Sequence, residues 1–225
     1  MQLPAYFLNR PVVEAGPETI AAFERLYTEY VEPGTGAEID YRLNAPKWQF
    51  LCYLGDHKNI LMHGSAAPDI SEFEPRQSND TEEFGNRKAV YASSDGIWPM
   101  YFAIVDRDRI NLLLNGCFHV IETDGTRSHG YYYFSVDRDA LPHYPWRNGM
   151  IYLLPGDTFE QQTHQQLHGM TIEVTQWASP VAVKPLAKLA VTPDDFPFLG
   201  QMNGHDPKVI SIKAVEDPQG YPWRD

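Results

Sequence analysis

The chain has 225 residues, of which 43% are hydrophobic, and its formal net charge is −12 with histidine neutral. This length and composition predict one large domain with a well-filled core. An acidic surface repels phosphate backbones, so nucleic acid is a disfavoured partner, although a local basic pocket for a nucleotide stays open. The apolar runs are far shorter than the roughly 20 residues of a membrane helix. The N-terminal residues also lack the pattern of a signal peptide, so we expect a cytoplasmic protein without membrane contact.

The first half of the chain predicts helices that alternate with short strands. Apolar residues recur at spacings of three and four after Pro17, which indicates a helix over 17–31. A second helix is expected over 46–56, with Pro46 in its first turn. Further along, the patterns predict a strand "NILMHGS" (59–65), a polar loop (66–88), a strand "AVYAS" (89–93) and a short helix from Pro99.

The second half reads as strands. Runs with alternating or continuous apolar residues predict strands over 110–122, 129–137, 150–161 and 169–179 and a last one within 180–197. Helices followed by strands indicate an α+β fold with antiparallel pairing. We divide the chain into an N-terminal helical extension (1–45) packed on the domain, a central domain (46–199) and an irregular C-terminal tail (200–225).

Several site chemistries find no support in the sequence. Cys52 and Cys117 stand in apolar surroundings, which favours buried free thiols over a disulfide, and there is no CxxC pair for zinc. His164 and His168 are four residues apart, but Gln165 stands where a zincin needs glutamate, and a third ligand cannot be assigned. We therefore expect no metal. The GxSxG, Walker A and GxGxxG motifs are also missing.

Two strand ends carry small polar residues that suit a planar ligand. Gly64 has no Cβ, which lets a ligand approach the backbone, and His63 offers a ring donor to a ribose hydroxyl. Tyr91 offers a flat face for stacking, while the small side chain of Ser93 leaves room for a ligand beside the strand. Together they predict a slot for a nicotinamide riboside. The alternative is that His63 and Tyr91 are ordinary strand-end residues with satisfied hydrogen bonds.

In combination, "LMHGS" and "AVYASSDGIWPMYFA" resemble the first two motifs of the ADP-ribosyltransferase superfamily, in its poly(ADP-ribose) polymerase-like branch. The resemblance implies a split antiparallel β-sandwich with N-terminal helices and NAD as the substrate. It also implies a nicotinamide slot and a second stacking aromatic at Tyr101 or Phe102. Arg76 is the candidate contact for the pyrophosphate. The slot residues would be His63, Gly64, Ser65, Tyr91 and Tyr101.

The third motif of this family departs from the usual pattern. The alignment places Gln176, before Trp177, where the family has a glutamate. A glutamine still hydrogen-bonds a ribose hydroxyl, but it carries no charge and cannot act as a general base. A carboxylate would have to come from Glu173, three residues upstream, or from Glu160.

Three functions therefore stay open. The first is mono-ADP-ribosyl transfer or NAD glycohydrolysis with release of nicotinamide, the acceptor being open. The second is a non-catalytic module that binds NAD or ADP-ribose, or docks a partner. The third is an RNA 2′-phosphotransferase-like activity that uses Arg76, Arg87 and Lys88, which the acidic charge disfavours. A structural α+β domain whose motifs match by chance is the remaining interpretation.

Overall fold

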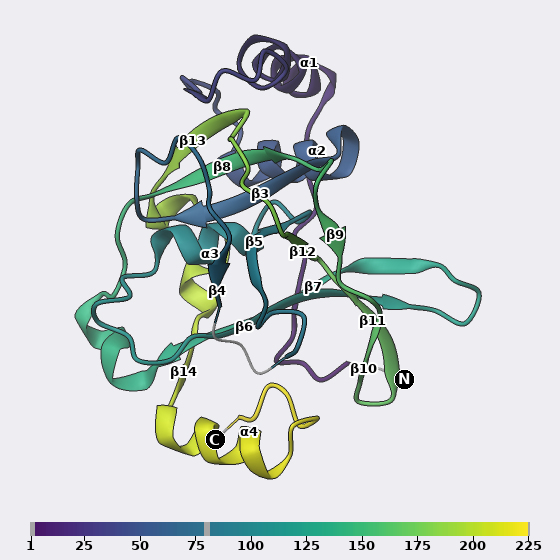
Figure 1. The fold of residues 1–225 in the computed structure, drawn as a ribbon, viewed down its shortest axis with the longest axis vertical. Helices are drawn as coiled ribbons and strands as arrows, with labels where there is room; N and C mark the ends of the chain where they lie inside the picture. Colours follow the sequence, from purple (N-terminus) through teal and green to yellow (C-terminus); the bar gives the residue numbers. More distant parts are fainter. Residues whose placement is uncertain (1–2, 79–81, 225) are drawn as a thin grey trace.

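The structure, a computed structural model, describes residues 3–78 and 82–224. Within these residues the chain forms a mixed α+β fold with few helices and two sheets that are mostly antiparallel (Figure 1). The expected fold class is confirmed at this level. No helix in the described ranges has both the length and the apolar character needed to cross a membrane.

Four α-helices are present in the described part of the chain. The expected helix over 17–31 is α1 (Pro17–Leu26), continued by a π-helical turn, η1 (Tyr27–Val31). Helix α2 (Lys47–Lys58) starts after Pro46, which has an extended ψ of 140° and so lies outside the first turn in which it was expected. The other helical segments are α3 (Trp98–Ile104), α4 (Pro207–Glu216), and the 3₁₀ turns η2 (Arg138–His143), η3 (Pro193–Asp195) and η4 (Leu199–Gln201).

One sheet has six strands in the order β1-β7-β6-β11-β10, with β14 paired to β7. Its centre is the long pair formed by β6 and β7, in which Leu114 lies opposite Ser135. The pairs are antiparallel except that of β14 with β7. The strands are β1 (Leu8–Asn9), β6 (Leu114–Ile121), β7 (Arg127–Asp137), β10 (Gln165–Leu167), β11 (Met170–Val174) and β14 (Asn203–His205).

The other sheet has eight strands in the order β2-β13-β8-β3-β5-β12-β9, with β4 paired to β5. Strand β3 lies at its centre between β8 and β5, so the "LMHGS" stretch lies in the middle of the sheet. The strands are β2 (Ala37–Glu38), β3 (Ile60–Ser65), β4 (Arg76–Gln77), β5 (Lys88–Ser93), β8 (Gly149–Pro155), β9 (Glu160–Gln161), β12 (Gln176–Ser179) and β13 (Ala187–Val191).

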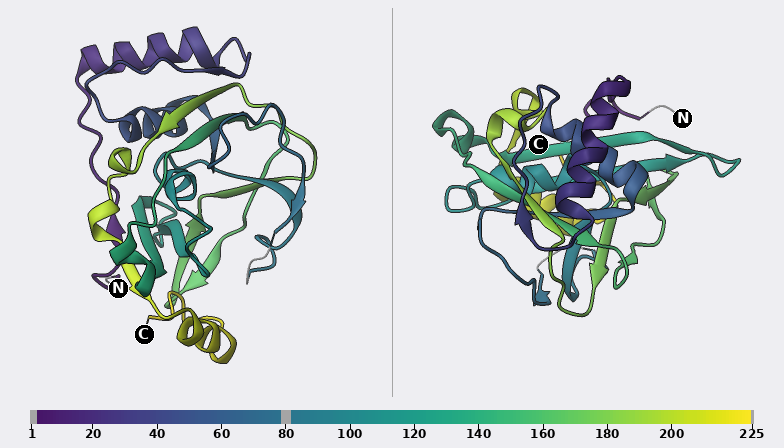
Figure 2. Two further views of the ribbon diagram at one scale, coloured as in Figure 1. Left: turned by 90° about the vertical axis from the view of Figure 1, so that its left-hand side faces the viewer. Right: turned by 90° about the horizontal axis from the view of Figure 1, so that it is seen from above.

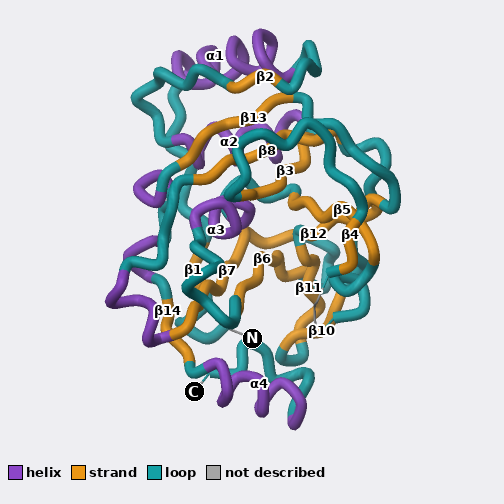
Figure 3. Tube along the Cα trace, turned by 60° about the vertical axis from the view of Figure 1, so that its left-hand side comes forward, coloured by secondary structure: helices purple, strands orange, loops and turns teal. Residues whose placement is uncertain are grey.

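Helix α3 lies between the two sheets (Figures 2 and 3). Its buried residues join one core cluster with Met62 and Leu153 of the eight-stranded sheet and Phe134 of the six-stranded sheet. Helices α1 and α2 pack on the same face of the eight-stranded sheet as α3, because their buried residues join the same cluster; among them, Phe23 and Phe50 have ring centres 5.4 Å apart. The α3 residues are therefore held on both sides by sheets.

The chain passes from one sheet to the other at Thr175. This residue is fully buried; its N–H donates to the carbonyl of Cys117 in one sheet, and its own carbonyl accepts from the N–H of Ser94 at the end of β5. The single strand expected over 169–179 is therefore wrong. It is two strands, β11 and β12, which belong to different sheets.

Both terminal segments add strands to the sheets. In the segment 1–45, β1 pairs with β7 and β2 with β13, in addition to helix α1. The expectation of an irregular tail over 200–225 is wrong for residues 203–216, which form β14 and α4. Asp206 caps this helix through its carboxylate, which accepts from the N–H groups of Lys208 and Val209.

Candidate functional site: the split between β3 and β5

Strands β3 and β5 part at the end of β3 that carries His63. The two strands, both fully described, pair at Met62 and Ser93 only, whereas β3 stays paired with β8 as far as Ser65. Beyond Met62 the imidazole of His63 spans the gap, with Nδ1 2.7 Å from the carbonyl oxygen of Tyr91. The His63 ring thus supplies the hydrogen bond that a backbone N–H of β3 would otherwise donate to Tyr91. We take this split between β3 and β5 as the candidate site.

The environment of His63 fixes its protonation. Burial lowers the pKa of His63, the hydrogen bond to Tyr91 partly opposes this, and the positive charges of Arg107 and Arg76 lower the pKa further. The ring is therefore neutral at pH 7. Because a carbonyl only accepts, Nδ1 carries the proton and donates, which leaves Nε2 as an acceptor. The expected ring donor for a ribose hydroxyl is thus already used, and the ring offers an acceptor instead.

Gly64 has a different role from the one expected. A Cβ on this residue would lie 1.8 Å from the carbonyl oxygen of Pro99 and 3.0 Å from the nitrogen of Ala103. Helix α3 therefore fills the space above the Cα, and no ligand approaches there. The missing side chain serves the close packing of α3 on β3.

The side chain of Tyr91 points away from that of His63. Val90 and Ala92, its neighbours in β5, pack in the cluster that contains Phe73, and the ring centre of Phe73 lies 4.7 Å from that of His63. Because side chains alternate along a strand, Tyr91 faces the other side of the sheet. Its hydroxyl donates to the carbonyl of Phe84 and accepts from the N–H of Arg87, both at 2.8 Å. The structure therefore does not bring the two predicted rings together.

The two candidates for the second stacking aromatic differ in exposure. Tyr101 is fully buried, and its hydroxyl donates to the carbonyl of Ser135 at 2.9 Å. Burial raises the pKa of the Tyr101 phenol, and its ring packs on Phe134, so no face remains for a ligand. Phe102 is only partly buried, against Trp98, and is the aromatic of α3 that keeps an accessible surface.

Both predicted serines make hydrogen bonds within the protein. Ser65 accepts from the N–H of Ala67 at 3.1 Å, in the turn that follows β3. Ser93 is buried, with its hydroxyl 3.0 Å from that of Thr175, and it accepts from the N–H of Asp95. Ser93 therefore helps to hold the crossing between the sheets and does not line the split.

Gln176 and Glu173 lie in different sheets. Gln176 is opposite Ser93 on β12, next to β5 and one strand from β3. Glu173 is opposite His119 on β11, and its carboxylate pairs with Arg127 at 3.2 Å and faces His164 at 3.7 Å. The other candidate carboxylate, Glu160 on β9, pairs with Arg87. Of the three, the uncharged amide of Gln176 is on the strand nearest the split.

Two arginines lie around the split, and the sequence singled out only one of them. Arg76 on β4 pairs with Ala89 of β5. Arg107, three residues beyond α3, places its guanidinium carbon 5.8 Å from the ring centre of Phe102. The charges of both reach His63. A polar residue after a helix gives no signal in the sequence that its side chain turns back over that helix.

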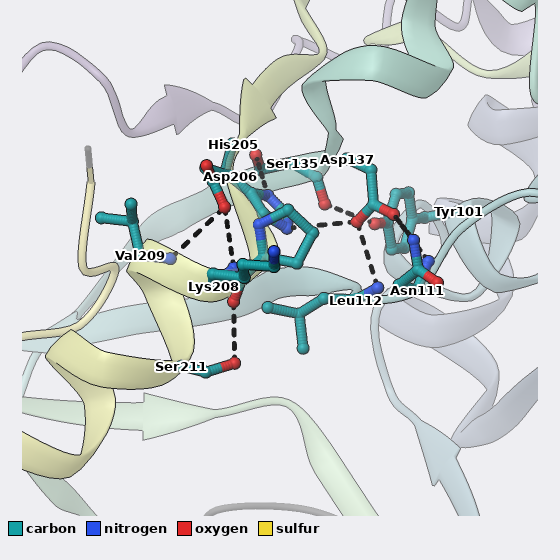
Figure 4. Close-up of polar contacts among 11 residues, drawn as sticks. Tyr101, Asn111, Leu112, Ser135, Asp137, His205, Asp206, Lys208, Val209 and Ser211 are labelled. Carbon is teal, nitrogen blue, oxygen red and sulfur yellow. Dashed lines mark hydrogen bonds and ion pairs between the residues drawn. The ribbon is translucent and has the colours of Figure 1, made fainter.

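A second polar cluster, which the sequence analysis missed, connects β7 to β14 (Figure 4). The hydroxyl of Ser135 lies 2.7 Å from Nδ1 of His205, whose Nε2 is 3.7 Å from the carboxylate of Asp137. That carboxylate also accepts from the N–H groups of Asn111 and Leu112. The residue types are those of a hydrolase triad, but Ser135 is 0% and His205 1% exposed, so no substrate reaches them. The spacing of Ser135 and Asp137 on one strand face was the available signal.

Two surface hollows lie away from the split. One, of about 530 Å³, is formed between the segment Asn111–Leu112 and helix α4. The other, of about 380 Å³, is lined by β2, Tyr41 and Lys47. Neither includes a residue that the sequence predicted for the site. Among the residues that the structure describes, no group of three or more His, Cys, Asp or Glu side chains is arranged to hold a metal.

Comparison with family models, with curated proteins and with solved structures finds no match for this chain.

Proposed function

We propose that this chain binds NAD or ADP-ribose at the split between β3 and β5 and does not transfer the ADP-ribose. The observation that carries the proposal is the placement of His63, Tyr91 and Gln176 on three adjacent strands, β3, β5 and β12. These are the positions that resemble the three motifs of the ADP-ribosyltransferases. The parting of β3 and β5 after Met62 supports the split sandwich that this resemblance implies.

The absence of transfer is argued from charge. Cleavage of the bond to nicotinamide builds positive charge on the ribose, which a carboxylate stabilises and a neutral amide does not. Gln176 is on the strand nearest the split, whereas Glu173 is in the other sheet with its charge balanced by Arg127. An RNA 2′-phosphotransferase is not favoured, because Arg87 is paired with Glu160 and lies over the ring of Phe84.

Calorimetric titration with NAD and with ADP-ribose tests the binding. We expect saturable binding, weakened by roughly fivefold in His63→Ala, which is the value of one hydrogen bond. His164→Ala is the matched control, because this exposed histidine faces Glu173 in the other sheet. If neither nucleotide binds, the proposed function is wrong.

Release of labelled nicotinamide from NAD tests the absence of transfer. The unaltered chain should release no more than the blank, and Gln176→Glu should raise the release if position 176 supplies the third motif. Release by the unaltered chain that disappears in Glu173→Gln would instead make Glu173 the catalytic group and refute the non-catalytic assignment.

A further inference from the structure

We infer that Arg107, together with Arg76, binds the pyrophosphate of the ligand beside His63. This inference rests on the proposed function and specifies how the same site recognises its ligand. It adds a binding residue that the sequence motifs do not contain.

Arg107 lies close to the contact between α3 and β3. Its guanidinium lies over the ring of Phe102, on helix α3. The same helix packs directly on Gly64 through Pro99 and Ala103, and Gly64 is the neighbour of His63. The cation is thus held beside the end of β3 at which the sheet splits.

Arg76 lies on β4, next to β5. Arg76 pairs with Ala89 of β5, two residues along the strand from Tyr91, whose carbonyl accepts from His63. Phe73, three residues before Arg76, contacts the ring of His63. The two arginines therefore approach one histidine from different elements, β4 and the segment after α3.

The charges around His63 are positive. Both charged side chains that shift the pKa of His63 are arginines. Neighbouring cations such as Arg109 and Arg147 are paired with Asp106, whereas in the described ranges neither Arg76 nor Arg107 has a carboxylate partner. Both are exposed. Two exposed cations without a counter-charge, in a chain of net charge −12, form a local site for an anion.

The size and chemistry of the ligand follow from this arrangement. Guanidinium groups bind phosphate oxygens through paired N–H donors, and two of them match the two phosphates of a pyrophosphate. The neutral Nε2 of His63, which both arginine charges reach, is an acceptor for a hydroxyl. A diphosphate linked to a ribose satisfies all three groups.

The test compares Arg107→Gln with Arg109→Gln in the same segment, where Arg109 is already paired with Asp106 and donates to the carbonyl of His143. Arg107→Gln should weaken ADP-ribose about tenfold, the range expected for one charge-assisted contact, and leave nicotinamide riboside, which has no phosphate, unchanged. Arg109→Gln should change neither. Equal affinity of the unaltered chain and Arg107→Gln for ADP-ribose would overturn the inference while the proposed function stood.

A second readout needs no nucleotide. Inorganic pyrophosphate bound between the arginines should raise the pKa of His63, followed by the NMR shift of its ring, in the unaltered chain but not in Arg107→Gln. This result would support the anion site even if NAD did not bind, in which case only the proposed function would fail. A His63 titration that pyrophosphate leaves unchanged would refute the anion site.

Discussion

At the scale of single residues, His63 should make the stability of the fold depend on pH. Its pKa in the folded chain is below the ordinary value of 6.5, mainly because of burial. As the pH falls below that value, the unfolded chain binds a proton before the folded chain does. His63 therefore contributes to the free energy of unfolding above about pH 6.5, and this contribution falls as the pH drops from there to the pKa of the folded chain. The slope is at most about 1.4 kcal/mol per pH unit for one proton.

Denaturant unfolding between pH 7.5 and 4.5 measures this effect. His63→Gln should reduce the loss in the free energy of unfolding at low pH. Part of the loss that remains should come from His119, whose pKa is also lowered by burial. His119→Gln is the matched variant, because this residue too bonds a carbonyl through Nδ1, that of Ser128 at 2.8 Å. A decline that is identical with and without His63 would show that this ring is charged in the folded chain or exposed to water.

The sequence identified residues that lie at the split, but not where their side chains point. The motifs picked out His63 and Tyr91, and the structure joins these residues, but through the carbonyl of Tyr91 and not its ring. The alternation of side chains along a strand predicts this orientation of the Tyr91 ring. Val90 and Ala92 are apolar and pack in a core cluster, so Tyr91 between them faces the other side of the sheet. His205 could not be found, because its partner Ser135 lies in a distant segment. Arg107 could not be found, because nothing in the sequence indicates that its side chain turns back over Phe102.

At the scale of elements, the packing of α3 on β3 is the contact that positions the split. Gly64→Ala forces a methyl group against the backbone of Pro99, where no side-chain rotation relieves the overlap. We expect a loss of about 2–3 kcal/mol in the free energy of unfolding, the range for overpacking in a core. Gly200→Ala, where an added Cβ meets nothing within 4 Å, is the control and should stay close to the unaltered chain. A Gly64→Ala variant as stable as the control would mean that α3 does not lie on β3 as described.

The elements themselves were largely predictable, and the exceptions share a cause. Periodicity located α1, which buries one face, whereas continuous apolar runs located α2, α3 and central strands such as β8, which are buried on nearly all sides. The break at Thr175 was missed because the run "MTIEVTQWAS" has strand-forming residues on both sides of it and no Gly or Pro to mark a boundary. The change of sheet is set by hydrogen bonds to Cys117 and Ser94, which lie far away in the chain.

At the scale of the whole molecule, the C-terminal segment belongs to the folded unit. Its sequence is rich in Pro and Gly after residue 216, which predicted an irregular tail, yet Ile210 and Trp223 are buried in a cluster with Phe7 and Phe118. Both ends of the chain thus contribute to one cluster, and β14 adds a parallel strand beside β7 of the six-stranded sheet. A chain organised this way should unfold in one transition.

Two substitutions on α4 test this unity. Ile210 is 2% exposed and Val215 is 82% exposed on the same helix. If α4 is part of the cooperative unit, Ile210→Ala should lower the global free energy of unfolding by about 3 kcal/mol, through lost burial and the cavity left behind. Val215→Ala should change it by less than about 0.5 kcal/mol. The measurement is denaturant unfolding followed by both tryptophan fluorescence and circular dichroism, with coincident transitions expected. A detached tail would give the opposite result, in which neither variant shifts the transition and residues 200–225 are lost to protease before the rest of the chain unfolds.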